Sequence, residues 1–284
     1  MTKRIPMLLF AVLLALAAIG QASARVRPQD QIQTNNKNVL SGQTIAMLVP
    51  QRCFSSGSGA TFLKICITDN GNISWFESPA GKVHLQSREG YAVCSSTNGS
   101  GVVHGFDANV AASGWGVSTV SEPNGAGTFP LIVTRHSLDG VIQFKQTFTL
   151  NVGERGIDAK MDVTNTSASS LQYVWISRYF DGDIDGVSTN AYDRTSDSVW
   201  GKDPADLTRG LMLTAAPSAT NSTFPSLSSY SAWNPNAPGS QYARGCSSSN
   251  YSASTGDYVG VVLTYLPGLA PGQTKSLTLR YRRF

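Results

Sequence analysis

The sequence predicts an all-β protein, and specifically an antiparallel β-sandwich. Short runs rich in β-branched and aromatic residues recur along the chain, and clusters of Gly, Asn, Ser and Pro separate them. No run of ten residues carries the apolar period of a helix. Such a pattern is typical of sheets that have one dry and one wet face.

The first 24 residues have the features of a secretory signal peptide. Lys3 and Arg4 precede an apolar run over residues 7–19, and small residues follow at 22–24. We therefore expect cleavage near Ala24 and a mature chain that is secreted or periplasmic. The run is too short for a transmembrane helix, and no later segment is apolar for long enough, so we expect no membrane span.

The remaining residues, 25–284, are expected to form one β-sandwich domain. Loss of Lys3 and Arg4 with the signal peptide lowers the formal charge from +4 to +2. The basic residues are scattered except for Arg280, Arg282 and Arg283, so the sequence does not predict nucleic-acid binding. A mature chain of about 260 residues is long enough to enclose a large single core.

Predicted strands follow one another from residue 44 to residue 283. In chain order they cover 44–49, 62–68, 73–77, 82–85, 91–94, 101–109, 114–120, 131–136, 141–151, 156–164, 171–180, 210–215, 258–265 and 275–283. The clearest meander spans residues 134–180, where an Asp-Gly turn at 139–140 and an Asn-Thr-Ser turn at 165–167 separate alternating apolar runs.

Four cysteines lie in the part of the chain that we expect to be exported, where thiols tend to be oxidised. Four cysteines allow three sets of two disulfides, and no two of them have the short spacing of a zinc ribbon. We favour a local Cys53–Cys66 bridge and a long-range Cys94–Cys246 bridge, while the other pairings stay open.

The densest run of carboxylates directly follows the predicted strand 171–180 and resembles the first half of a calcium loop. Asp181, Asp183 and Asp185 alternate, and Gly186 stands sixth. Position twelve is a Tyr instead of Glu, but Asn190 and Asp193 are near enough to close a looser loop. Because all of these ligands are oxygens, the predicted cation is calcium. The alternative is an acidic turn at a strand end.

Residues 215–257 are rich in Ser, Asn, Pro and Tyr and are predicted to form a long loop. Tyr230, Trp233 and Tyr242 are the candidate ligand-binding residues of this loop, because their rings could stack on a sugar. The alternative is that these rings pack the loop onto the sandwich.

Signatures of common hydrolases are absent: the sequence has no HExxH, GxSxG or SxxK motif. If the protein is an enzyme, the best catalytic candidates are His84, Glu89, Arg178 and Tyr179. A histidine changes its charge near neutral pH and could act as a base beside a carboxylate. The alternative is that these residues are satisfied parts of the core or surface.

Two resemblances accompany these patterns. The block Glu89-Gly90-Tyr91 with Cys94, together with Arg178-Tyr179 and the alternating Asp residues after them, resembles secreted bacterial β-sandwich proteins of uncharacterised function. This resemblance implies the fold and no activity. The order of a Gly-led early strand, a long hairpin and a strand after an Asn-Thr turn is similar to galactose-mutarotase-like supersandwiches. In those proteins the comparable strand leads to a catalytic His, where this chain has Arg178 and Tyr179.

Together these patterns predict a secreted binding or structural module that is stabilised by calcium and binds carbohydrate or a cell-surface component. The alternative is a carbohydrate-active enzyme, such as a lyase or an epimerase, on a supersandwich scaffold. A flat aromatic face would favour binding, and a cleft with converging Arg, Tyr, His and carboxylate groups would favour catalysis.

Overall fold

The computed structural model describes residues 49–86, 89–97, 100–108, 112–151, 155–182, 184–186, 191–203, 205–216, 221–229, 254–255 and 258–284. Over these residues the protein is an all-β antiparallel sandwich without an α-helix, so the predicted fold class is confirmed. The predicted signal peptide lies outside these residues and stays a prediction. Within the described chain, no helix is long and apolar enough to cross a bilayer.

The strands form three sheets. The first has the order β1 (Gln51–Ser56), β2 (Leu63–Thr68), β3 (Ile73–Glu77) and β4 (Val83–Gln86). The second has the order β16 (Ser222–Ser229), β18 (Tyr258–Leu269), β12 (Leu171–Phe180), β5 (Glu89–Thr97), β6 (Ser100–Asp107) and β7 (Ala112–Ser113). The third has the order β17 (Ser254–Thr255), β13 (Ala191–Arg194), β14 (Ser198–Asp203), β15 (Asp206–Ala215), β19 (Thr274–Arg283), β11 (Gly156–Asn165), β10 (Ile142–Asn151), β9 (Leu131–His136) and β8 (Thr119–Ser121).

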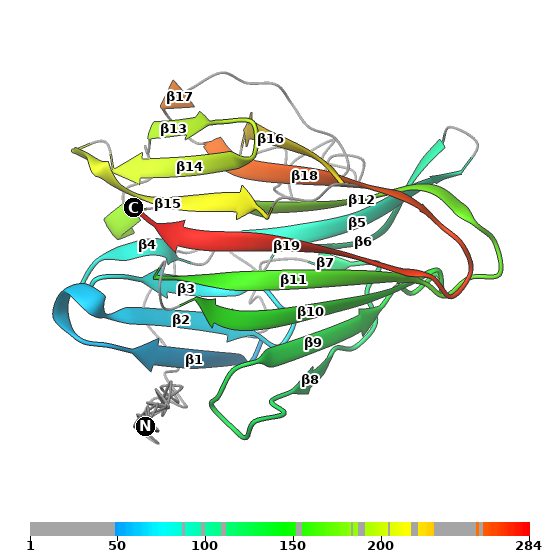
Figure 1. Cartoon of the computed structure of the whole chain (residues 1–284), viewed down its shortest axis with the longest axis horizontal. Coiled ribbons are helices and arrows are strands. Elements are labelled where there is room, and N and C mark those ends of the chain that lie inside the picture. Colours follow the sequence, from blue (N-terminus) through cyan, green and yellow to red (C-terminus); the bar gives the residue numbers. More distant parts are fainter. Residues whose placement is uncertain are drawn as a thin grey trace, which may run out of the picture.

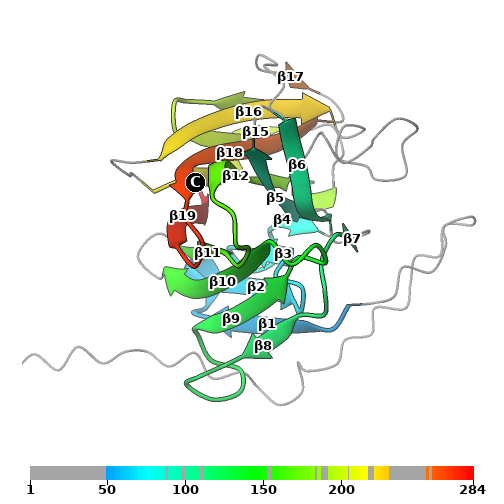
Figure 2. The ribbon, with the colours of Figure 1, turned by 90° about the vertical axis from the view of Figure 1, so that its right-hand side faces the viewer.

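The large third sheet forms one layer of the sandwich, and the two smaller sheets lie against its inner face (Figure 1). Buried residues from all three sheets belong to one core, for example Phe76 on β3, Ile176 on β12 and Phe144 on β10. In Figure 2, β5 and β6 lie in the upper part of the view, and β9 and β10 lie in the lower part. One hydrophobic core therefore joins the described sheets, and a second, smaller cluster lies on the other face of the six-stranded sheet.

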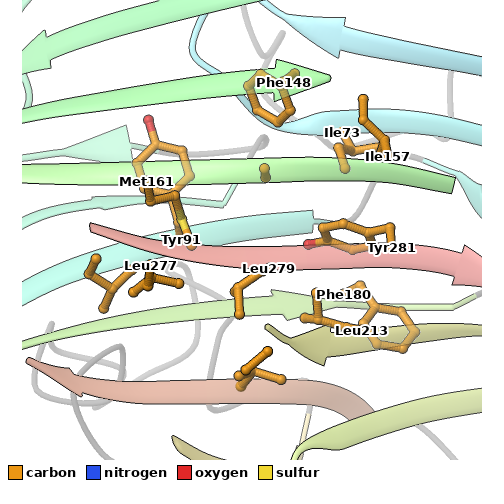
Figure 3. Packing of buried hydrophobic residues seen from close by; sticks show 14 of the residues in the cluster. Ile73, Tyr91, Phe148, Ile157, Met161, Phe180, Leu213, Leu277, Leu279 and Tyr281 are labelled. Atoms are coloured by element: carbon orange, nitrogen blue, oxygen red, sulfur yellow. The ribbon is translucent and has the colours of Figure 1, made fainter. Parts of the chain in front are cut away.

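Strict alternation explains why β10 and β11 form paired strands of the large sheet with one buried face. On β10, Ile142, Phe144 and Phe148 point inward and are buried, while Lys145 and Thr149 face outward. Figure 3 shows the inward side chains of neighbouring strands meeting in this core, including Phe148 of β10, Ile157 and Met161 of β11, and Tyr281 of β19. Of the predicted meander over residues 134–180, β9, β10 and β11 pair in sequence, but β12 crosses to the six-stranded sheet, so the prediction was wrong about the pairing of its last strand.

Other predicted boundaries were wrong. Residues 114–120 do not form one strand, since Trp115 makes an isolated bridge and only Thr119–Ser121 pairs as β8. The predicted loop over residues 215–257 contains β16, an eight-residue strand that pairs with β18, and the two-residue β17. Its Ser-rich sequence, STFPSLSS, hides the strand because it lacks apolar alternation.

The predicted Cys53–Cys66 disulfide is present and joins directly paired residues of β1 and β2. Cys94 is buried on β5, and the described part of the chain contains no free cysteine. Cys246 lies outside the described residues, so the Cys94–Cys246 pairing stays a prediction.

Candidate functional site

Two of the four catalytic candidates, Glu89 and Arg178, meet in the core. Glu89 begins β5 and Arg178 lies near the end of β12, and the two strands are neighbours. The guanidinium of Arg178 forms an ion pair with Glu89 Oε1 and donates to Tyr281 Oη at 2.9 Å. It also donates to Gln146 Oε1 at 2.7 Å and to the backbone carbonyl of Gly71 at 3.0 Å.

Glu89 and Arg178 are both fully buried, and the surrounding groups satisfy their charges. Tyr281 Oη donates to Glu89 Oε1 at 2.6 Å, and the backbone N–H of Ile73 donates to Oε2 at 2.8 Å. Burial raises the pKa of Glu89, although the Arg178 charge opposes this change. Burial disfavours the charged form of Arg178 as well, but Glu89 outweighs that effect and raises the pKa of the guanidinium. Because the pair is enclosed by protein, the geometry favours a structural role for it.

His84 and Tyr179 lie apart from this ion pair. His84 on β4 is buried, and its Nε2 hydrogen-bonds the carbonyl of Ser78 at 2.6 Å. Burial lowers the pKa of His84, and its buried Nδ1 has no hydrogen-bond partner among the described residues. Tyr179 follows Arg178 directly, so its side chain lies on the opposite face of β12. Its hydroxyl lies 3.4 Å from the carbonyl oxygen of Ala108. The four candidates therefore do not converge on one cleft.

The described residues of the predicted calcium loop point to different partners. Asp181 is buried, with Oδ1 3.5 Å from the hydroxyl of Tyr192. Asp185 pairs with Arg209 at 2.6 Å, and Asp193 accepts from the N–H of Arg194. The described chain contains no group of three His, Cys, Asp or Glu side chains that could hold a metal. Asp183 and Asn190 lie outside the described residues, and the calcium site stays a prediction.

The predicted stacking residues Tyr230, Trp233 and Tyr242 also lie outside the described residues. The structure instead shows an aromatic patch on the six-stranded sheet, which we define as Tyr173, Trp175 and Tyr265. Tyr173 and Trp175 are two residues apart on β12, and Trp175 pairs directly with Tyr265 on β18. All three side chains therefore lie on the outer face of the sheet.

The aromatic patch is partly open to solvent. Tyr173 is 58% exposed and Tyr265 is 36% exposed, whereas Trp175 is buried between neighbours. The rings of Trp175 and Tyr265 have centroids 5.6 Å apart. Ser96 pairs directly with Tyr173, and Ser222 pairs directly with Tyr265, so hydroxyl-bearing residues border the rings. The patch therefore offers an amphipathic surface with a tyrosine at each end.

The sequence contained a signal for this patch that the predictions missed. Positions 173 and 175 alternate within the correctly predicted strand 171–180, which places two aromatic side chains on one face. The position of Tyr265 beside Trp175 could not be read from the sequence, because it depends on the long-range pairing of β12 with β18.

Solved structures that resemble this fold include the following three. One is a bacterial glucoamylase complexed with acarbose, which is 8% identical and has a TM-score of 0.51 over 80% of this chain. Another is a polysaccharide lyase, which is 14% identical and has a TM-score of 0.46 over 81% of this chain. The third is a kojibiose phosphorylase from the human microbiome whose assignment is provisional; it is 10% identical and has a TM-score of 0.40 over 81% of this chain. The chain spans 31%, 33% and 24% of those longer chains. No family model and no curated protein matches the chain. At such low identity, the comparison with the glucoamylase concerns the fold alone.

Proposed function

We propose that this protein is a carbohydrate-binding β-sandwich of the cell exterior. The observation that carries the proposal is the aromatic patch of Tyr173, Trp175 and Tyr265. Exposed tyrosines on a rigid sheet supply an apolar ring and a polar hydroxyl at a low cost in side-chain entropy. A sugar ring has the complementary character, since one face carries C–H groups and its edge carries hydroxyls.

The sheet positions the aromatic patch without a loop. Tyr173 and Trp175 are held by the pairing of β12 with both β5 and β18, so their spacing is fixed before any ligand arrives. A preformed surface loses less conformational entropy on binding than a loop that must become ordered. Support for a carbohydrate ligand also comes from the fold, because the glucoamylase that shares it was solved with acarbose.

Binding is tested with the full mature chain and a panel of soluble polysaccharides, by affinity electrophoresis and then calorimetry. Tyr173→Ala and Tyr265→Ala are each expected to weaken binding about tenfold, or ~1.4 kcal/mol, because each removes one stacking ring. The matched control is Phe284→Ala, since Phe284 has a similar exposure of 38% but lies after β19 in the large sheet.

Two results would contradict the proposal. One is the absence of retention by any polysaccharide in the panel. The other is an equal loss of binding in Phe284→Ala and Tyr173→Ala, which would show that the aromatic patch is not the site.

A further inference from the structure

Ser95, His104 and Asp139 form a continuous chain of hydrogen bonds that the proposed sugar-binding surface does not use. Ser95 Oγ lies 2.7 Å from His104 Nε2, and His104 Nδ1 lies 2.6 Å from Asp139 Oδ2. Both distances are those of strong hydrogen bonds. A serine, an imidazole and a carboxylate in this order have the geometry of an activated nucleophile, its base and the group that orients the base.

The fold brings these residues together from two strands and a turn. Ser95 lies on β5 and His104 on β6, next to a register shift between Val93 and Cys94 in the β5–β6 pairing. Asp139 lies in the turn between β9 and β10, in the opposite layer of the sandwich. The hydrogen bond between His104 and Asp139 joins the two layers. No local motif encodes the cluster, because its members are 9 and 35 residues apart.

Hydrogen bonds within the turn hold Asp139 in place. Its Oδ1 accepts from Ser137 Oγ at 2.5 Å and from the backbone N–H of Val141 at 3.0 Å, which leaves Oδ2 for His104. Partial burial opposes ionisation of Asp139, but these hydrogen bonds and the one to His104 outweigh it and lower its pKa. A carboxylate can only accept, so Nδ1 of His104 carries a proton. In the neutral imidazole Nε2 then accepts from the Ser95 hydroxyl.

We propose that Ser95, His104 and Asp139 form a nucleophilic site that hydrolyses small acyl esters. Ser95 Oγ attacks the ester carbonyl and gives its proton to His104 Nε2, and that proton passes to the leaving alkoxide as the ester C–O bond breaks. Water then attacks the acyl-serine with His104 as base, which releases the carboxylic acid and restores the Ser95 hydroxyl. The two steps consume one ester and one water and produce one acid and one alcohol.

Burial restricts the acyl group to the smallest class. Ser95 is 2% exposed and His104 is 4% exposed, while the side chain of Asp139 is 40% exposed and marks the solvent side of the cluster. We therefore expect the site to take an acetyl group, because a long acyl chain would have to displace the core.

The test uses a small fluorophosphonate, followed by mass spectrometry of peptides, and p-nitrophenyl acetate as substrate. The folded mature chain is expected to give one adduct on Ser95, and Ser95→Ala to lose both the adduct and the hydrolysis. Asp139→Asn is expected to slow hydrolysis by ~10²-fold or more, because the amide favours the wrong imidazole tautomer. Asn retains an Oδ1 acceptor for Ser137 and Val141, so this variant preserves the turn.

Ser121→Ala is the control, because Ser121 is an exposed serine on β8 that belongs to neither the Ser95 cluster nor the aromatic patch. It should react and hydrolyse at the wild-type rate. The absence of a Ser95 adduct on the folded wild-type chain overturns the proposal, and this measurement requires no variant to fold. An unchanged labelling rate in His104→Gln overturns it as well. Neither result bears on polysaccharide binding, which is measured separately.

Discussion

The stability of the core depends strongly on the buried charge of Arg178. Removing one partner of a buried ion pair leaves the other charge unpaired, and such changes typically cost 3–5 kcal/mol. Arg178→Met is therefore expected to lower the free energy of unfolding by about 3–5 kcal/mol, measured by urea denaturation at neutral pH. The same substitution at Arg280, whose pair with Asp158 is partly exposed, is expected to cost less than about 1 kcal/mol.

The pH dependence of Arg178→Met follows from Glu89. Burial raises the pKa of Glu89 in the folded protein, and removal of the Arg178 charge raises it further. A folded pKa above the unfolded value means that the folded state binds the proton more tightly. The stabilisation that results is complete below the unfolded pKa and is lost as pH rises through the folded pKa. Urea denaturation from pH 4 to pH 8 should therefore show a steeper loss of stability in Arg178→Met than in the wild type.

If the difference in stability between Arg178→Met and the wild type did not vary with pH, the assignment of this effect to Glu89 would be wrong. The double variant Arg178→Met with Glu89→Gln provides the control, because it has no ionisable group at either position. Its stability is expected to vary with pH less than that of Arg178→Met.

Asp185 gives a second prediction at the residue scale, because protein groups already occupy its carboxylate. Arg209 lies 2.6 Å and Lys82 3.6 Å from Oδ2, and the N–H of Val83 donates to Oδ1 at 3.0 Å. Partial burial opposes ionisation, but the Val83 and Arg209 bonds outweigh it and lower the pKa of Asp185. Stabilisation from a lowered pKa is present above the unfolded pKa and is lost as pH falls through the folded one.

Asp185→Asn is accordingly expected to lower the Tm by about 1–3 °C at neutral pH, and the difference should disappear in acid. Because the partners are protein groups, the decrease should be the same in EDTA and in millimolar calcium. Thermal melts at neutral and at acid pH, each in EDTA and in millimolar calcium, check this expectation. A decrease that occurs only with calcium would instead support the predicted calcium loop.

At the scale of an element, β6 depends on the absence of a side chain at Gly105. A Cβ there would lie 2.1 Å from the indole of Trp115, which cannot move freely because it stacks on Phe144 and lies beneath the guanidinium of Arg135. Gly105→Ala is expected to destabilise the protein by about 1–3 kcal/mol through overpacking, as measured by urea denaturation. Gly116→Ala is the control, since its Cβ meets no atom closer than 3.3 Å; an equal loss there would contradict the steric explanation.

Elements were predictable from the sequence where one face is apolar and the other is wet. β10 and β11 satisfy this condition at nearly every position, and the turn between β9 and β10 has an Asp-Gly signal. β16 does not, because it contains Pro225 and several Ser residues and owes its pairing to β18. Pairing with β18, and not the local β-propensity of the sequence, therefore makes residues 222–229 a strand.

The candidate sites were less predictable than the fold because they depend on long-range pairing. Arg178 and Glu89 were singled out for their chemistry, but only the neighbouring positions of β5 and β12 show that they form a buried pair. Ser95, His104 and Asp139 come from both layers, and none of them lies in a recognised motif. The sequence predicts which strands exist far better than which side chains they bring together.

At the scale of the whole molecule, β19 joins two parts of the large sheet that otherwise do not touch. It pairs with β11 on one side and with β15 on the other, and it comes after both of them in the chain. A growing chain that has reached only β18 therefore presents two unpaired sheet edges, each able to pair with another chain. A premature stop codon before β19 would produce an aggregation-prone fragment instead of a smaller functional protein.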